Sequence, residues 1–298
     1  RVSVFERHAG VASETSFANA GVLAPGYVAP WAAPGMPWKI LSQLGARDAA
    51  VRFGGWNVMR QLPWLWRWWR SCAAAVHRDN REAMQSLAAY SRRRLQQLSD
   101  RLSLDYEQAQ GYLVLLRGER EADAARQGAK LLEAAGVTPH WLDAAGARRV
   151  EPGLSAATEL VAALHLPQDG VGNCRQFAHL MRQEGQRGGV HYRFEHVVSR
   201  LRSGAEARVE WADPRGRTGS EAFDGIVLCA GHRANELLRP IGLRLPLLPV
   251  YGYSVTAPLR TDEGPSERAP RSALMDERYK VAVSRLGQRV RVAGSAEL

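Results

Sequence analysis

The sequence predicts an α/β fold, and three observations lead to this prediction. A short apolar run at residues 1–5 alternates like a strand and is followed by an acid, Glu6. A stretch dominated by small residues then runs from Thr15 to Trp31. Beyond it, helix-like and strand-like patterns alternate along the 298 residues, an order typical of α/β proteins. This length suits one large domain or two interleaved ones.

The overall composition excludes several classes of protein. Hydrophobic residues make up 45% and charged residues 23%, as in ordinary globular proteins. The formal net charge is +10, but the 40 basic residues are scattered, which argues against a nucleic-acid-binding face. The 3 cysteines lack paired spacing and the 8 histidines are dispersed, so neither disulfides nor a metal site are predicted. No run reaches the ~18 apolar residues of a spanning helix, and we expect a reducing, cytoplasmic compartment.

The first strand and its acid suggest a dinucleotide site. In dinucleotide-binding βαβ folds, an acid at the end of the second strand accepts hydrogen bonds from the adenosine ribose. The glycine fingerprint of such folds lies about 20 residues before that acid. Because the chain starts at Arg1, we expect Glu6 to end the second strand and the first βα unit to be missing.

The small-residue stretch from Thr15 to Trp31 has two interpretations. A backbone without bulky side chains lets a flat ligand approach closely, and Thr15 and Ser16 place hydroxyls beside it. The alternative is a loop whose small residues serve tight packing.

A Trp-rich segment from Trp56 to Arg70 follows, and it also has two interpretations. We favour an aromatic wall packed between domains. The alternative is a patch at a membrane interface, where Trp and Arg side chains suit the headgroup zone. After it, Asn80 is expected to cap a helix that runs to about Leu102, since apolar residues recur there at three- and four-residue steps.

The middle of the chain predicts an insertion over residues 105–167 that covers the active site. Its expected elements are strands at 111–117, 139–142 and 160–166, a helix at 119–135, and a small helix ending near Glu151. After it, Gly170 and Gly172 begin like a dinucleotide fingerprint, but Arg175 stands at the third glycine position, so we reject that site. Asn173 is expected to cap the next helix.

The last third predicts further strands. Alternating apolar residues indicate strands at 190–194, from Val197 onward, and around 209–211. The apolar run 224–231 predicts a buried strand with Cys229 in the core, ending in a tight turn at Ala230 and Gly231. Strands at 247–255, 280–283 and 289–293 are expected to form a second sheet.

An ordered series of motifs along the chain resembles one enzyme family. It begins with E-T-S-F-A-N-A-G-V-L-A-P-G-Y-V-A-P-W-A-A-P-G at residues 14–35. It continues with A-A-Y-S-R (88–92), Y-E-Q-A-Q-G (106–111), V-E-P (150–152), L-P-V-Y-G-Y-S-V-T (248–256), D-E-R-Y-K-V-A-V-S-R (276–285) and R-V-A-G-S-A-E-L (291–298). The series resembles the D-amino acid dehydrogenase small subunits of the glycine oxidase and D-amino acid oxidase family, which are FAD-dependent amine oxidoreductases.

The resemblance implies two interleaved domains. A truncated, Rossmann-like FAD-binding domain would comprise residues 1–104 and 168–245. A smaller α+β substrate domain would comprise residues 105–167 and 246–298 and lack a C-terminal segment that carries a substrate-binding Arg. The isolated chain is therefore expected to bind FAD poorly and to be inactive.

The resemblance also implies the reaction. FAD takes a hydride from Cα of a D-amino acid, and the imino acid hydrolyses to a 2-oxo acid and ammonia. Electrons then pass to a quinone, with the protein cytoplasmic or peripheral on the inner face of the bacterial plasma membrane. One alternative is an amino acid or sarcosine-type oxidase that uses oxygen. Another is a flavin-free remnant that acts as a binding surface.

The resemblance also implies a role for each of several residues of this sequence. Glu6 is expected to hold the ribose and Val197 or Val198 the adenine. The residues expected along the ribityl chain and flavin ring are Thr15, Ser16, Ala20, Gly21 and Val22. Ala230 and Gly231 are expected to approach the diphosphate, and Tyr253 and Tyr279 to face the substrate. Two positions depart from the family pattern: Tyr251 stands where Lys is usual, and His232 replaces a smaller residue.

Overall fold

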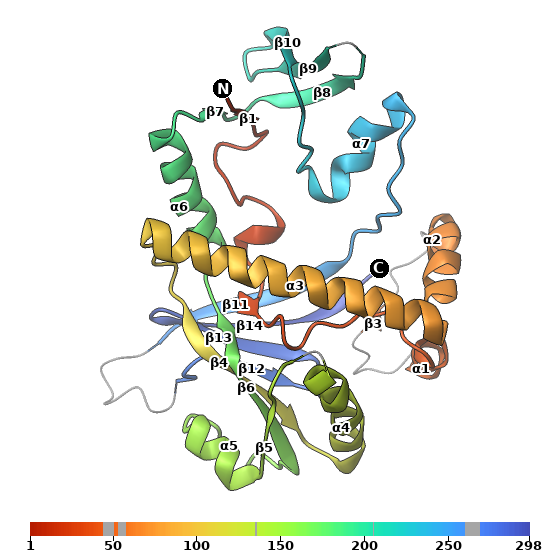
Figure 1. Ribbon diagram of the computed structural model, residues 1–298, viewed down its shortest axis with the longest axis vertical. Helices are drawn as coiled ribbons and strands as arrows, with labels where there is room; N and C mark the ends of the chain where they lie inside the picture. The colour runs from red at the N-terminus through yellow and green to blue at the C-terminus, as the bar shows by residue number, and fades with distance from the viewer. Residues whose placement is uncertain (44–50, 53–57, 135, 205, 260–268) are drawn as a thin grey trace. The chain divides into compact units, whose positions relative to one another are not determined.

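The chain folds into two units, each assembled from two separate stretches of sequence (Figure 1). The computed structural model describes residues 1–43, 51–52, 58–134, 136–204, 206–259 and 269–298. The smaller unit comprises Arg1–Phe17 and Ala178–Pro249, and the larger unit Ala18–Phe177 and Val250–Leu298. Residues 18–104 therefore cluster with 105–167, whereas the expected boundaries placed them with 168–245. Which stretch serves the cofactor and which the substrate stays a prediction.

The smaller unit contains two small sheets. In the first, β1 (Ser3–Phe5) lies parallel to β7 (His191–Arg193), with Val4 opposite Tyr192. The second is antiparallel in the order β10-β9-β8. Its strands are β8 (Val197–Arg202), β9 (Ala207–Ala212) and β10 (Thr218–Phe223). Short helical turns complete the unit: η1 (Thr15–Phe17), η3 (Gly231–Arg233), α7 (Ala234–Leu238) and η4 (Arg239–Ile241).

The larger unit is built on one sheet in the order β11-β14-β13-β12-β4-β6-β2, with β3 beside β14 and β5 beside β6. The strands from the first half are β2 (Val22–Leu23), β3 (Val51–Arg52), β4 (Ala109–Leu116), β5 (His140–Leu142) and β6 (Ala162–Val171). Those from the end are β11 (Tyr251–Pro258), β12 (Ala273–Asp276), β13 (Val281–Leu286) and β14 (Arg289–Glu297). β4 lies parallel to β12 and antiparallel to β6.

Among the described residues, five helices belong to the larger unit, and a sixth begins in it. They are α1 (Met36–Gln43), α2 (Val58–Ser71), α3 (Ala74–Leu102), α4 (Glu119–Ala134), α5 (Ala144–Val150) and α6 (Cys174–Arg187). As predicted, Asn173 caps α6, because its Oδ1 accepts the Gln176 N–H at 3.2 Å. Among the described residues, no helix is both long and apolar enough to cross a bilayer.

The core of the larger unit lies on both faces of the sheet. Successive side chains of a strand point to opposite faces, so β4 contributes to two clusters. Tyr112, Val114 and Leu116 face one cluster, which α4 and the partly buried residues Val22, Ala24 and Tyr27 cover. Leu113 and Leu115 face the other, beside Ala147 of α5. The predicted strands and helices between 109 and 171 are confirmed, with small shifts of their ends.

Two predictions about local structure are wrong. The helix α3 begins at Ala74, so Asn80 lies inside it, and no side chain caps its start at Ala73. The reason is that Ala74 and Ala75 are strong helix formers, so nothing halts the helix at Asn80. Residues 224–231 are not a buried strand: Val227 is 88% exposed and Cys229 is exposed. No strand of the described chain pairs with this run, and an apolar run without a ladder partner cannot satisfy its backbone as a strand.

Candidate cofactor and substrate sites

In the larger unit, side chains of the sheet hold the start of the small-residue stretch. Ser254 Oγ on β11 donates to the carbonyl oxygen of Ala18 at 2.7 Å. Arg291 Nη1 on β14 donates to the carbonyl oxygen of Asn19 at 2.8 Å. The Gly21 N–H donates to Asn19 Oδ1 at 3.2 Å, which folds the backbone back on itself. Hydrogen bonds therefore fix the backbone at Ala18, Asn19 and Gly21, on both sides of Ala20.

Gly21 and Val22 are held at the end of β6, where Val22 pairs with Val171 and Gly21 contacts Gly172 directly after the strand. The Gly172 N–H donates to the Gly21 oxygen at 2.8 Å, and a Cβ on Gly21, whose φ is +71°, would lie 2.8 Å from the Gly172 oxygen. This close approach is to the protein's own backbone, and Val22 packs its side chain on the core. Ala20 differs, because neither its N–H nor its C=O makes a hydrogen bond to a described residue. Ala20 therefore offers an open backbone edge, which fits the flat cofactor that the small residues predicted.

The second half of the stretch is anchored by two acids that the sequence analysis missed. The Gly26 N–H donates to both carboxylate oxygens of Asp169, at 3.2 and 3.1 Å. Asp169 is 3% exposed, and burial raises its pKa to about 6. The Tyr27 hydroxyl donates to Glu277. At Gly26 and Tyr27, the structure therefore agrees with the alternative interpretation, in which this stretch is a tightly packed loop.

The two candidate substrate tyrosines lie at different places on the sheet. The Tyr253 hydroxyl on β11 donates to Glu297 Oε2 at 2.6 Å. Ser254 donates to Ala18 and Thr256 accepts from Arg291, so strand alternation places Tyr253 on the opposite face of β11. Tyr279 lies between β12 and β13, exposed, with its ring centroid 5.4 Å from the Arg117 guanidinium carbon. The structure thus does not bring Tyr253 to the backbone of Ala20, and the roles of both tyrosines stay predictions.

In the smaller unit, Glu6 directly follows β1. Its N–H donates to the Arg193 oxygen and its own oxygen accepts the His196 N–H, both at 3.0 Å, so the backbone stays paired beyond the strand. Its carboxylate Oε1 accepts the His8 N–H at 2.8 Å, while Oε2 accepts no hydrogen bond from a described residue. Ligands of open α/β sheets bind at the carboxyl ends of parallel strands. Glu6 therefore fits the predicted role of a ribose acceptor.

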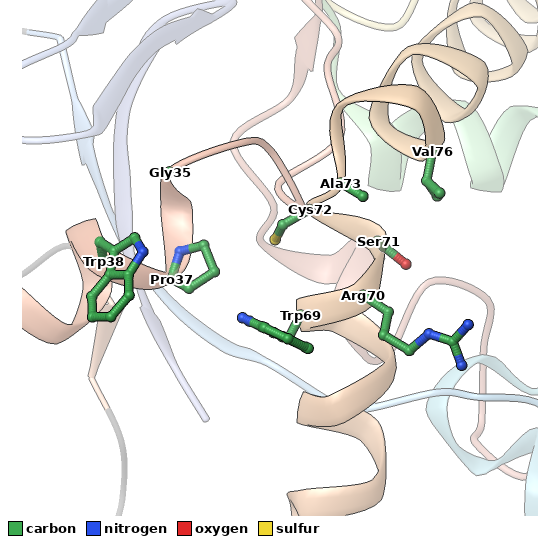
Figure 2. Close-up of a pocket in the computed structure, with 9 residues that line it drawn as sticks. All are labelled: Gly35, Pro37, Trp38, Trp69, Arg70, Ser71, Cys72, Ala73 and Val76. Carbon is green, nitrogen blue, oxygen red and sulfur yellow. The ribbon is translucent and has the colours of Figure 1, made fainter.

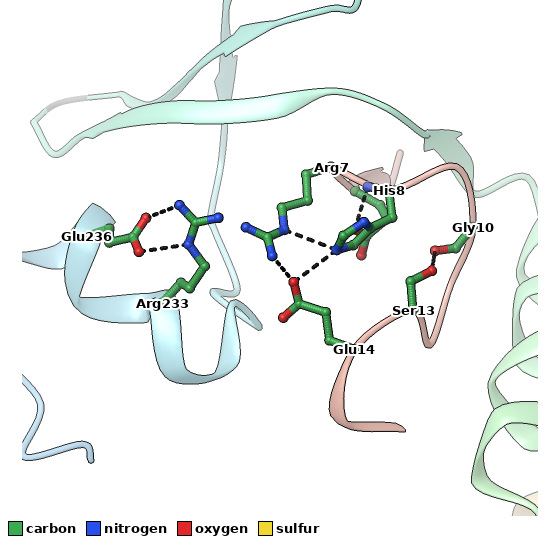
Figure 3. Close-up of polar contacts among 8 residues, drawn as sticks. Arg7, His8, Gly10, Ser13, Glu14, Arg233 and Glu236 are labelled. Carbon is green, nitrogen blue, oxygen red and sulfur yellow. Dashed lines mark hydrogen bonds and ion pairs between the residues drawn. The ribbon is translucent and has the colours of Figure 1, made fainter. Parts of the chain in front are cut away.

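A cluster of charged residues surrounds the loop after Glu6 (Figure 3). Arg7 forms an ion pair with Glu14, and His8 Nε2 lies 2.9 Å from Glu14 Oε1. The Phe17 N–H donates to the Glu14 oxygen at 2.9 Å, which starts the turn η1 that carries Thr15 and Ser16. Arg7 and His8 were not among the predicted site residues, although their place directly after a strand-ending acid is a usable signal.

The other predicted cofactor residues also belong to the smaller unit. Val197 begins β8 and is exposed, and Val198 pairs with Trp211. Ala230 precedes the turn η3, and its oxygen accepts the Arg233 N–H at 3.1 Å. Gly231 is exposed with φ +51°, and a Cβ at this position would meet no atom within 4 Å, so a ligand can approach its backbone. Arg233 itself is paired with Glu236 at 2.5 and 2.7 Å (Figure 3).

A third feature is a cavity of about 680 Å³ in the larger unit (Figure 2). Trp38 of α1 and Trp69 of α2 line it, together with Pro37, Arg70, Ser71, Cys72, Ala73, Val76 and Gly35. Trp38 is 76% exposed, and Trp69 stacks on Trp66 with ring centroids 5.1 Å apart. Trp56, the start of the predicted Trp-rich segment, lies outside the described residues. Over the described ranges, no three His, Cys, Asp or Glu side chains gather as metal ligands would.

Solved structures identify the class of fold. The chain matches glycine oxidase from Geobacillus kaustophilus with a TM-score of 0.67 and 18% identity, covering 99% of this chain and 65% of that one. It matches FAD-bound L-alpha-glycerophosphate oxidase from Mycoplasma pneumoniae with a TM-score of 0.62 and 16% identity, covering 99% and 65%. At these identities the likeness shows the fold alone, and that fold is the one predicted, an α/β FAD-binding architecture with an interleaved α+β part.

Sequence relatives identify the family. The model of the FAD dependent oxidoreductase family matches residues 1–298, and the chain belongs to that family. D-amino acid dehydrogenase from Cereibacter sphaeroides (strain ATCC 17029) is 40% identical over 301 residues, covering 100% of this chain and 67% of the relative. The D-amino acid dehydrogenase of Neisseria meningitidis serogroup C is 36% identical over 299 residues, covering 100% and 70%. The predicted oxidoreductase class and FAD cofactor are confirmed, and the chain spans about two thirds of its relatives' length.

Proposed function

We propose that the protein oxidises D-amino acids to 2-oxo acids and ammonia. The observation that carries this proposal is the likeness to D-amino acid dehydrogenases at 36–40% identity along the whole chain. When bound, FAD supplies the acceptor for the hydride that leaves Cα. The task of the chain is then to hold the cofactor, orient the substrate and exclude competing geometries.

The residues that would hold FAD offer complementary groups. Glu6 presents a carboxylate oxygen, Oε2, that accepts no hydrogen bond from the described residues, which suits a ribose hydroxyl. Ala20 offers a free backbone edge to the flavin ring system, and the exposed Gly231 leaves room for the diphosphate. Thr15 and Ser16 carry hydroxyls on η1 that suit the ribityl chain.

Selectivity for the D-enantiomer follows from geometry. When the carboxylate and amine of the substrate are both held, only one enantiomer directs its Cα–H toward the flavin. Of the two candidate tyrosines, Tyr279 is the better one. Its hydroxyl has no hydrogen-bond partner within the described ranges, whereas the Tyr253 hydroxyl is committed to Glu297.

We further propose that electrons pass to a quinone and that the protein sits peripherally on the inner face of the plasma membrane. Helix α2 contains no acidic residue, carries Arg67 and Arg70, and exposes Trp66 and Trp69. Such a basic, Trp-bearing helix suits the headgroup zone of an anionic membrane.

The reaction is tested with the full-length, FAD-loaded enzyme under anaerobic conditions. We expect reduction of a quinone analogue with D-alanine but not with L-alanine or sarcosine. Turnover that requires oxygen and releases peroxide would support the oxidase alternative instead. Reduction by sarcosine alone would contradict the proposal.

The membrane contact is tested by sedimentation with vesicles that contain anionic lipid. We expect the double variant Trp66→Ser/Trp69→Ser to lose most of its binding. Trp141→Ser is the matched control, because Trp141 is also exposed but lies on β5. Equal binding by the double variant and the wild type would remove α2 from the contact.

A further inference from the structure

Arg291 is a buried arginine that forms no ion pair with any described residue, although Glu107 lies near enough to act on its charge. It lies in β14 and is 8% exposed. Its Nε donates to Thr256 Oγ1 at 2.9 Å, and its Nη1 donates to the Asn19 oxygen at 2.8 Å. No carboxylate of the described chain forms an ion pair with it, whereas its neighbour Arg289 is paired with Glu107 at 2.7 Å. Burying a guanidinium without an ion-pair partner is costly, so its retention requires a reason.

The position of Arg291 supplies such a reason. The planar guanidinium of Arg291, which belongs to β14, links Thr256 of β11 to the carbonyl oxygen of Asn19, directly before Ala20. Ser254 donates to the carbonyl oxygen of Ala18, one residue earlier. These bonds determine where the open backbone edge of Ala20 lies. A guanidinium remains protonated in proteins, so the same residue also places a permanent positive charge behind that backbone.

We propose that Arg291 is a positioning residue for the flavin-facing backbone at Ala20, and that its charge favours the reduced flavin. This inference rests on the proposed function, since it requires that Ala20 lies against FAD. Reduction adds negative charge to the flavin ring system, so a nearby cation stabilises the reduced form more than the oxidised form.

The test compares Arg291→Met with Arg289→Met in the full-length protein. Both variants lose one positive charge from the same face of β14, two residues apart. Arg289 contacts Glu107 and makes no hydrogen bond to residues 18–21. The measurements are the dissociation constant of FAD, the visible flavin spectrum and the midpoint potential.

We expect Arg291→Met to raise the FAD dissociation constant at least about tenfold, as for loss of a hydrogen bond to a charged group. Its flavin potential should fall and its flavin absorbance bands should shift. Arg289→Met should lower stability while leaving the potential and the spectrum as in the wild type. Arg291→Lys should recover the potential but not the full affinity, because Lys keeps the charge and loses the fork.

Equal effects of the two Met variants on the flavin would overturn the proposal, as would an unchanged flavin in Arg291→Met. If Arg291→Met does not fold, Ser254→Ala keeps the test decisive, since it removes only the adjacent bond to Ala18. We expect this variant to weaken FAD binding several-fold, and unchanged binding would count against the proposal. If the flavin responds as expected but no D-amino acid is oxidised, the proposed function fails while this inference stands.

Discussion

The small-residue stretch Thr15–Trp31 and the end of the apolar run 224–231 were both predicted to approach the cofactor, yet their hydrogen bonding differs. In the larger unit, residues 18–27 are held by Ser254, Arg291 and the buried Asp169. In the smaller unit, residues 224–231 form no strand, and Val227 is exposed. A composition rich in small residues indicates that a segment can lie close to a ligand. Whether the backbone of that segment is fixed depends on the hydrogen-bond partners that the fold supplies.

The largest expected difference concerns the two glycines with positive φ, Gly21 and Gly231. Gly21→Ala should lower the free energy of unfolding by about 2–4 kcal/mol, because left-handed strain adds to a clash with the Gly172 oxygen. Gly231→Ala carries the strain without the clash and should cost about 1–2 kcal/mol. Urea unfolding of both variants measures the difference, and equal losses would show that the two segments are packed alike.

The pH dependence of stability sharpens the comparison at Asp169. Its pKa rises from 3.8 to about 6 on folding, so the folded state holds the proton more tightly than the unfolded state. Stability is therefore greatest below about pH 4 for this group and falls as the pH rises through about 6. In Asp169→Asn this fall should be smaller by about 2–3 kcal/mol. Asp123→Asn, which changes an exposed carboxylate, is the control and should follow the wild type.

A third prediction concerns Glu6 in the smaller unit, where we expect effects on cofactor binding rather than on stability. Glu6→Gln should weaken FAD binding in the full-length protein by about 1.5–3 kcal/mol, the range for a hydrogen bond to a charged group. The unfolding midpoint without FAD should stay as in the wild type. A dissociation constant equal to that of the wild type would exclude Glu6 from the site.

The smallest expected effect is at Tyr27. Tyr27→Phe removes the hydroxyl that donates to Glu277 and should lower the free energy of unfolding by about 1–2 kcal/mol. Tyr90→Phe, on the exposed face of α3, should change it by less than about 0.5 kcal/mol. If both variants unfold alike, the Tyr27 bond does not anchor its segment.

Patterns local in sequence were sufficient for much of the fold. Helix α4, strand β4 and the Asn173 cap depend on neighbouring residues, so periodicity and capping rules predict them. The anchors of the small-residue stretch were not predictable in this way. Gly26 and Asp169 are 143 positions apart, and Asn19 and Arg291 are 272 apart. Such pairs are set by strand order and register, which a single sequence does not display.

The strand predicted at residues 224–231 was wrong for a related reason, because an apolar run forms a strand only beside a partner strand. The predicted site residues divide between the two units. Local patterns indicated Glu6, Thr15 and Ser16, whereas the family resemblance supplied the roles of the others. Arg291 was missed because scattered arginines carry no signal until the fold shows which of them are buried. Arg7 and His8 were missed although they directly follow the strand-ending acid Glu6.

Amide hydrogen exchange of the chain from Arg1 to Leu298 tests the central comparison most directly. The amides of Gly26 and Gly172 are hydrogen-bonded to Asp169 and Gly21, whereas residues 226–228 pair with no strand of the described chain. We expect Gly26 and Gly172 to exchange at least about a hundredfold more slowly than residues 226–228, after correction for intrinsic rates. Exchange at residues 226–228 as slow as at Gly172 would contradict the conclusion that hydrogen bonds fix the backbone of residues 18–27 but not that of residues 224–231.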